Sequence, residues 1–103
     1  MNEHMANIAL PRFPLGQCCM TPGISALVEQ YGLPVFVFLQ RHQHGDWGDL
    51  DQHDLKANEE ALQHDLRILS SYHFQPAAGV SIKLWIITEA DRSVTTVLLP
   101  EEY

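Results

Sequence analysis

Apolar residues recur at helical spacing in the first third of the chain. They are Ile24, Leu27, Val28 and Tyr31. Thr21 can cap a helix that carries Pro22 in its first turn, and Gly32 can end it in the left-handed conformation. The pattern therefore predicts a helix over residues 22–31.

The apolar run 35–39 has no periodicity and fits either a buried strand or a buried helix. Its valines and phenylalanines favour a strand. Pro34 in a first turn and Gly45 as an end signal favour a helix over 33–42, which is the interpretation we adopt. The residues 42–51 that follow are rich in turn formers and predict a loop.

Widely spaced leucines place one apolar stripe on the next element. They are Leu55, Leu62, Leu66 and Leu69. Asp51 can cap this helix, which we predict over 52–66. The acidic residues between the leucines belong on its solvated face.

β-Branched and aromatic residues dominate the last third of the chain and form three runs. We predict strands over 67–74, 81–88 and 93–99, with the middle one apolar on both faces as in a central strand. The connections 75–79 and 89–92 are short, which makes the three strands an antiparallel meander.

The order of these elements predicts an α+β fold, in which N-terminal helices pack on a small C-terminal antiparallel β-meander of three to four strands. Residues 13–20 predict a further short strand. The length of 103 residues suits one domain, which we assign to 13–103. Residues 1–12 are polar and lack periodicity, so they predict a flexible lead-in.

Composition narrows the function classes. Hydrophobic residues make up 46% of the chain, which argues against intrinsic disorder. The net charge of −7 disfavours general binding to nucleic acid backbones or to anionic membranes. No apolar stretch reaches the roughly 18 residues of a membrane helix, and the first residues lack the features of a signal peptide. The adjacent Cys18 and Cys19 favour reduced thiols, so we expect a cytoplasmic protein without a membrane partner.

Histidine and aspartate are concentrated between residues 42 and 54, and both residue types bind divalent metals. The set is His42, His44, Asp46, Asp49, Asp51, His53 and Asp54. No spacing among them matches a known metal motif, and loop aspartates commonly cap helices and turns. We therefore predict no metal and no cofactor.

The same region is a candidate interaction surface. Its carboxylates could imitate the phosphates of DNA and block a host defence enzyme, and an ordinary solvated face is the alternative. The candidate interaction residues are Asp46, Trp47, Asp49, Asp51, Asp54, Glu59 and Glu60, with Asp65 extending the acidic face. Trp47 and Trp85 are expected to pack rather than to stack on bases.

Several segments resemble a family of short, uncharacterised proteins of proteobacterial plasmids and integrative conjugative elements. The likeness covers residues 13–103. It is carried by residues 41–50, 67–72, 85–96 and 98–103, the last of which reads Leu-Leu-Pro-Glu-Glu-Tyr. The resemblance implies a bacterial, cytoplasmic, mobile-element setting and leaves the activity open.

Over fewer residues, the chain is also similar to ribonuclease toxins of the barnase/EndoU/RelE-like fold, through a histidine before a Gly-Asp pair and a later Arg-x-x-Thr. These enzymes cleave RNA without metal, with a base, an acid and a cation at the phosphate. The likeness would make His42 or His44 the base or acid. It would make Arg92 the cation and Thr95 a positioning donor, provided that all share one cleft. The alternative is that Arg92 pairs with an acidic neighbour in its own turn.

Three functions remain in competition: an interaction protein of a mobile element, a metal-independent ribonuclease and a structural module without chemistry. We favour a protein partner, and expect nucleic acid as a ligand only if the ribonuclease interpretation holds. A homodimer is a further expectation, because the run 93–99 is apolar enough to pair with its own copy.

Overall fold

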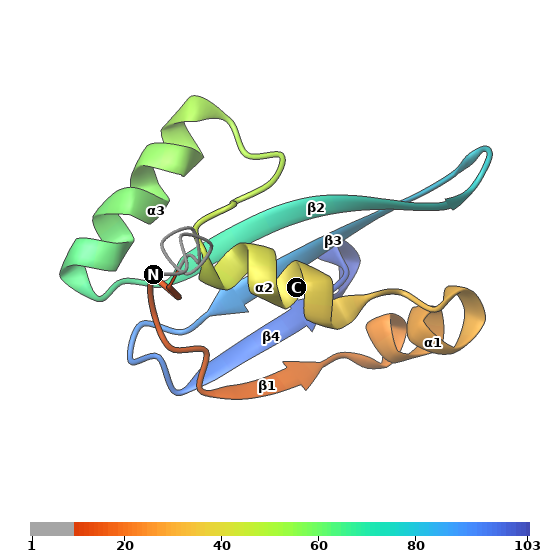
Figure 1. Ribbon diagram of the computed structural model, residues 1–103, viewed down its shortest axis with the longest axis horizontal. Helices are drawn as coiled ribbons and strands as arrows, with labels where there is room; N and C mark the ends of the chain where they lie inside the picture. The colour runs from red at the N-terminus through yellow and green to blue at the C-terminus, as the bar shows by residue number, and fades with distance from the viewer. Residues whose placement is uncertain (1–9) are drawn as a thin grey trace, which may run out of the picture.

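The computed structural model describes residues 10–103, which form three α-helices, one four-stranded sheet and a short 3-10 helix (Figure 1). In chain order the elements are β1 (Gln17–Met20), α1 (Pro22–Tyr31), α2 (Val35–Gln43), α3 (Gln52–His64), β2 (Ile68–Ala77), β3 (Val80–Thr88), β4 (Val94–Leu98) and η2 (Pro100–Glu102). The predicted α+β class is confirmed. Most of the predicted flexible lead-in, residues 1–9, lies outside the described residues.

The sheet is mixed. Its strand order is β1-β4-β3-β2, so the predicted antiparallel meander β2-β3-β4 is present and β1 joins it as a fourth strand. β1 runs parallel to β4, with Gln17 opposite Val94 and Met20 opposite Val97, so the prediction of antiparallel pairing holds for three strands only. The expectation that the run 93–99 pairs with another copy is wrong, because β1 and β3 occupy both sides of β4.

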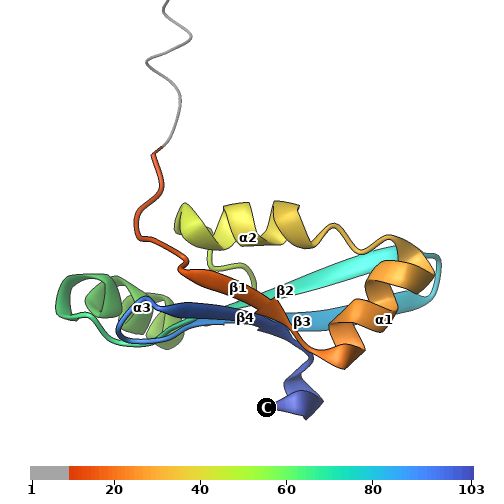
Figure 2. The ribbon, with the colours of Figure 1, turned by 90° about the horizontal axis from the view of Figure 1, so that it is seen from below.

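Helix α2 lies across one face of the sheet (Figure 2). Its Phe38 is buried in a core that includes Tyr72 and Ile86 from the strands below. Burying such a side chain contributes about 1.5–3 kcal/mol. The predicted helix is confirmed, but it is buried on one side only: Phe36 is 71% and Val37 53% exposed.

Helix α3 packs beside β2 at one margin of the sheet. The Asn58 amide donates to the carbonyl of Leu69 at 2.6 Å and accepts from the Leu69 N–H at 3.1 Å, so a side chain replaces a neighbouring strand there. Further along, Gly48 forms an isolated parallel bridge with Ser71. A second core cluster of Phe13, Trp47, Ala61 and Ile68 fills the space between α3 and the sheet. These contacts cover the first half of the β2 margin.

The helix boundaries follow from their caps. The Thr21 hydroxyl accepts from the N–H of Ile24 at 3.4 Å, and Gly32 has a φ of 67°, so α1 agrees with its prediction. α3 begins after Asp51 as predicted but ends at His64, two residues early, because Asp65 takes the left-handed conformation with a φ of 52°.

The predicted turn 75–79 is too long. β2 continues to Ala77 and β3 begins at Val80. A register shift between Phe74 and Ala77 accommodates Pro76 within the strand. None of the helices between residues 10 and 103 has the length and apolar character needed to span a membrane.

Candidate functional site

His42, the first catalytic candidate, is fully buried between α2 and the sheet. Its ring contacts the Ser70 hydroxyl through Nδ1 and the Thr88 hydroxyl through Nε2, at 2.5 and 2.9 Å. Phe13 and Trp47 meet the ring edge-on, with centroids 5.2 and 5.9 Å away. Burial lowers the pKa of His42 to about 3, so the ring is neutral near pH 7.

A chain of hydroxyl groups fixes the tautomer of this ring. Thr95 Oγ1 donates to the carbonyl of Leu15 at 2.7 Å, so its one proton is used there. Thr88 must then be the donor in the 2.7 Å contact between the two threonines. Thr88 in turn accepts from His42, which places the ring proton on Nε2 and leaves Nδ1 to accept from Ser70. The network joins α2, β2, β3, β4 and the segment before β1.

Arg92 serves the backbone rather than an open cleft. Its guanidinium donates to four carbonyls, those of Ala61, Leu66, Glu89 and Ala90, at 2.7–3.2 Å. Ala61 lies in the last turn of α3, so Arg92 places a cation at the negative end of that helix. Its own φ of 62° sets the turn before β4. The alternative that Arg92 pairs with an acidic neighbour in its own turn is wrong: of Glu89, Arg92 contacts only the main-chain carbonyl, whereas the Asp91 carboxylate accepts from Ser93 and the Glu89 carboxylate accepts from Arg67.

The four ribonuclease candidates are therefore not gathered in one open cleft. His42 and Thr95 are fully buried, and both are held by the hydroxyl network. His44 contacts the carbonyl of Gln40 through Nδ1 at 2.7 Å, on the helix end that it terminates. The arrangement provides a rigid interior and no surface at which these groups could meet one phosphate.

The acidic candidates gather at α3 and the loop before it. Residues 46–65 hold seven acidic side chains and one basic, Lys56, and so supply six of the seven net negative charges of the chain. Two arginines from outside the segment pair with it: Arg41 with Asp46 at 2.7 Å and Arg12 with Glu59 at 2.8 Å. Four net negative charges remain at this end after both pairings.

Several of these acids also hold local structure. Arg41 lowers the pKa of Asp46, and Arg12 lowers that of Glu59. Asp51 caps α3 through the N–H of Asp54 at 2.9 Å, and Asp49 pairs with the ring of His73 across the β2 margin. Asp54 and Glu60 stand on the solvated face of α3, away from the partly buried Leu55 and Leu62. Leu66, which was expected on the same apolar stripe, lies beyond the helix and is 52% exposed.

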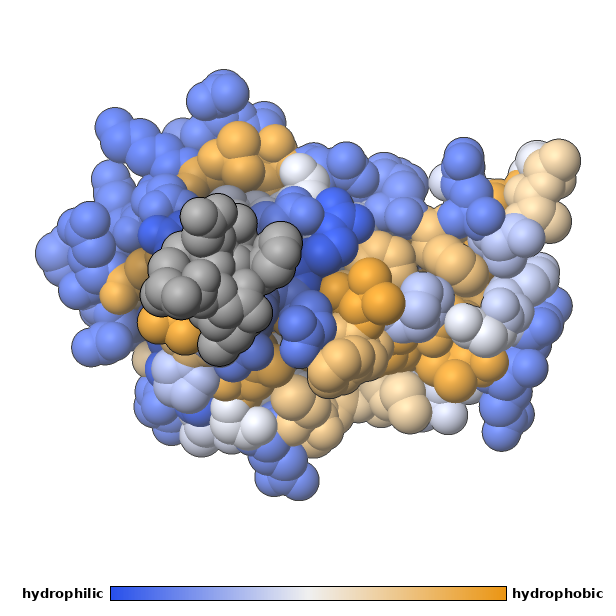
Figure 3. Space-filling model, viewed as in Figure 1, coloured by the Kyte–Doolittle hydropathy of each residue, from blue (hydrophilic) through white to orange (hydrophobic). Residues whose placement is uncertain are grey.

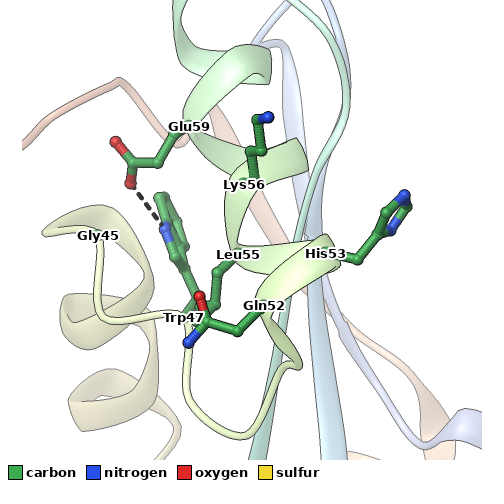
Figure 4. A pocket seen from close by; sticks show the side chains of 7 residues that line it. All are labelled: Gly45, Trp47, Gln52, His53, Leu55, Lys56 and Glu59. Atoms are coloured by element: carbon green, nitrogen blue, oxygen red, sulfur yellow. Dashed lines mark hydrogen bonds between the residues drawn. The ribbon is translucent and has the colours of Figure 1, made fainter.

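A shallow hollow of about 700 Å³ opens between α3 and the loop before it (Figure 4). It is lined by Gly45, Trp47, Gln52, His53, Leu55, Lys56 and Glu59. The buried indole of Trp47 donates to Glu59 at 3.0 Å, which orients the carboxylate at the rim. Trp47 packs as expected. Arg12, placed by the sequence in the lead-in, was missed as the other partner of Glu59, because no local pattern joins residues so far apart.

Asp51, His53 and Asp54 could offer three ligand atoms to a metal, all within 4.8 Å of one another. Each stands at the exposed start of α3, and Asp51 is already the N-cap of that helix. The chemistry of the set would suit a divalent ion, but no second observation supports one. The absence of a metal stays a prediction.

The comparisons with known proteins identify no relative. No family model, no curated protein and no solved structure matches this chain. The resemblances described from the sequence therefore stay expectations.

Proposed function

We propose that this protein acts by binding another protein, and that its acidic end engages a basic, nucleic-acid-binding surface of that partner. The acidic end is α3 together with residues 46–51. The observation that carries the proposal is the concentration of net charge: six of seven net negative charges lie in residues 46–65, at one margin of the sheet. A partner surface that normally holds phosphates would complement it in sign.

The shape of this end supports the same proposal. Asp54 and Glu60 are presented on a helix whose inner side is fixed to the sheet by Asn58. A rigid helix holds charges in place without a large loss of conformational freedom on binding. The hollow beside Trp47 offers an apolar floor at which a long side chain of the partner could insert.

Charge complementarity of this kind mainly governs the association rate and its dependence on salt. DNA mimicry and inhibition of a defence enzyme are the particular forms that we favour. The mobile-element and cytoplasmic setting remains a prediction from the resemblance.

The test compares two double variants of equal charge. Asp54→Asn/Glu60→Gln removes two charges from the acidic end, and Glu29→Gln/Glu101→Gln removes two from the exposed surfaces of α1 and η2. Immobilised wild type and both variants are exposed to a bacterial lysate, and bound proteins are eluted with a short DNA duplex. Each protein so eluted is purified and its dissociation constant is measured with all three.

The proposal requires that at least one eluted protein binds the α3 variant about tenfold more weakly than wild type, since two exposed charges at an interface contribute roughly this much. The control variant should bind it like wild type. Equal binding to both variants, or capture that duplex DNA does not displace, would count against the proposal.

A further inference from the structure

We propose that the open margin of β1 pairs with β1 of a second copy, antiparallel and about a two-fold axis that passes beside Cys19. The resulting dimer has one continuous eight-stranded sheet. This inference uses the margin opposite the acidic end and does not depend on the proposed partner.

The first observation is that, among residues 10–103, no strand pairs with one side of β1. It is the terminal strand of the sheet, and all four of its residues are exposed. The N–H of Gln17 donates to the carbonyl of Ser93, just before β4, at 2.9 Å, and the N–H of Thr21 donates to the carbonyl of Val97 in β4 at 3.1 Å. Because successive residues of a strand alternate in direction, the N–H and C=O groups of Cys18 and Met20 point away from β4. Such a margin is a template for a further strand.

The second observation is the contrast between the two margins. The β2 margin is covered by Asn58 and by the bridge to Gly48, as described above. Exposed β margins are usually protected by charges, prolines or covering loops. The segment 13–40 contains a single charged residue, Glu29, in 28 positions, and β1 itself has none. β1 therefore lacks the side chains that would prevent pairing.

The third observation is an apolar surface beside this margin. Met20, Phe36 and Val37 are 49%, 71% and 53% exposed, and Figure 3 shows the apolar area over α2 extending toward β1 and α1. An antiparallel strand pair about a two-fold axis keeps α2 of both copies on the same face of the sheet. The exposed side of each α2 would then face its counterpart across the new strand pair.

The distribution of charge favours the β1 margin over the acidic end as the place where a second copy approaches. Two copies with a net charge of −7 each repel when their acidic ends meet. Pairing through β1 keeps those ends at opposite margins of the doubled sheet. The span is about 30 Å or more at roughly 4.8 Å per strand, several times the screening length of about 8 Å at physiological salt.

One register of the antiparallel β1 pair uses every N–H and C=O group that points away from β4. Gly16 has a φ of 66° and Pro22 begins α1, so the extended stretch offers only Cys18 and Met20 to a partner. Pairing Cys18 with Met20 of the other copy, and the reverse, makes four hydrogen bonds. Cys19 then lies opposite its own copy in a non-hydrogen-bonded pair, with Cα atoms about 4.5 Å apart, which is within the range of a disulfide. The two Cys18 residues are diagonal, about 8–9 Å apart and beyond that range.

The matched cysteine variants test this register. Cys18→Ser keeps only Cys19, Cys19→Ser keeps only Cys18, and both thiols are exposed. Because burial and the neighbouring thiol raise the pKa of Cys18, the yield of each variant is normalised to the rate at which its thiol reacts with a small alkylating agent. Each variant is incubated with oxidised glutathione. One Cys19 thiolate displaces glutathione to form a mixed disulfide, and the second Cys19 thiolate displaces the other glutathione, so two thiols are oxidised and two glutathione thiols are released.

We expect Cys18→Ser to form at least about fivefold more covalent dimer than Cys19→Ser, because only Cys19 lies within bridging range. The excess should vanish in denaturing urea. Equal yields, or a greater yield from Cys19→Ser, would overturn the proposed register.

A second pair of variants tests the dimer without oxidation. Met20→Lys places a charge on the β1 margin, and Gln75→Lys places the same charge on an exposed position of β2. Under reducing conditions, sedimentation velocity up to about 100 µM should show dimers for wild type and Gln75→Lys and monomers for Met20→Lys. A monomeric wild type, or a Met20→Lys protein that is as dimeric as wild type, would refute the dimer. Neither result bears on the capture of a basic partner by α3.

Discussion

Acidification should destabilise this protein through His42 before its carboxylates begin to titrate. The ring is neutral in the folded protein because burial lowers its pKa to about 3, whereas in the unfolded chain it has the ordinary value near 6.5. Between these values the unfolded state binds more protons, so stability rises with pH. The contribution is complete above the unfolded pKa and is lost progressively as pH falls toward the folded pKa.

The size of the effect follows from the two pKa values. Between about pH 7 and about pH 5 the unfolded ring takes up most of a proton and the folded ring almost none, which lowers the free energy of unfolding by about 2 kcal/mol. The total loss in the free energy of unfolding approaches about 4–5 kcal/mol near pH 3, because each unit of difference between the two pKa values corresponds to about 1.4 kcal/mol. Carboxylates with lowered pKa values, such as Asp46 and Glu59, titrate below the range from about pH 7 to about pH 5.

Urea unfolding at a series of pH values in this window provides the assay, with His42→Gln as the control. Glutamine keeps polar atoms near the hydroxyl network and does not titrate. The wild type should lose about 2 kcal/mol more than the variant across the window. Equal pH slopes would refute the reasoning. An NMR titration of the folded wild type gives an independent reading, because the His42 ring should keep its proton on Nε2 and should not titrate above about pH 5.

Three further predictions concern the framework. Gly48→Ala should cost several kcal/mol, because its Cβ would lie 2.0 Å from the Ser71 carbonyl. Gly79→Ala, at the same φ of 76°, should cost only about 1 kcal/mol, because among the described residues other than its chain neighbours no atom would lie within 4 Å of the new Cβ. Chemical denaturation would measure this difference, and equal costs would contradict the contact. Arg92→Ala should lower the free energy of unfolding by about 2–3 kcal/mol, because four backbone carbonyls would lose their charged hydrogen-bond donor. Chemical denaturation would also measure this loss. Asn58→Ala should cost about 2–3 kcal/mol and increase hydrogen exchange at the start of β2; protection equal to wild type there would show that Asn58 does not hold this margin.

Local sequence signals were sufficient to predict an element when the residues at its own start and end define its boundaries. Thr21, Pro22 and Gly32 define α1 without help from the rest of the chain, and the structure agrees. α2 was predicted as a helix, but its apolar residues surround the axis, so the pattern could not show that Phe36 and Val37 would be left exposed. Which side of α2 is buried depends on strands that are far away in the sequence.

The candidate site was harder because its partners are far apart in sequence. His42 was interpreted as a candidate catalytic group at the junction of a helix and a loop, and its partners Ser70 and Thr88 lie 28 and 46 residues away. Arg92 was interpreted as a cation for a phosphate or as the partner of an acidic neighbour in its own turn, but the carbonyls that it binds belong partly to the end of α3. The acidic end, by contrast, follows from composition along one short segment, and the sequence located it correctly at α3.

The parallel pairing of β1 with β4 has a consequence for how the chain is made. Gln17 and Val94 are 77 residues apart, so during synthesis β1 emerges long before the strand that will hold it. Contacts of such long range slow folding, because the intervening chain must be ordered first. The α1 cap also depends on late residues, since Glu102 accepts from the N–H of Gly23 at 2.9 Å. A nascent chain therefore carries β1 with both of its sides open. In that interval its two cysteines and its uncharged side chains are open to contact with other chains.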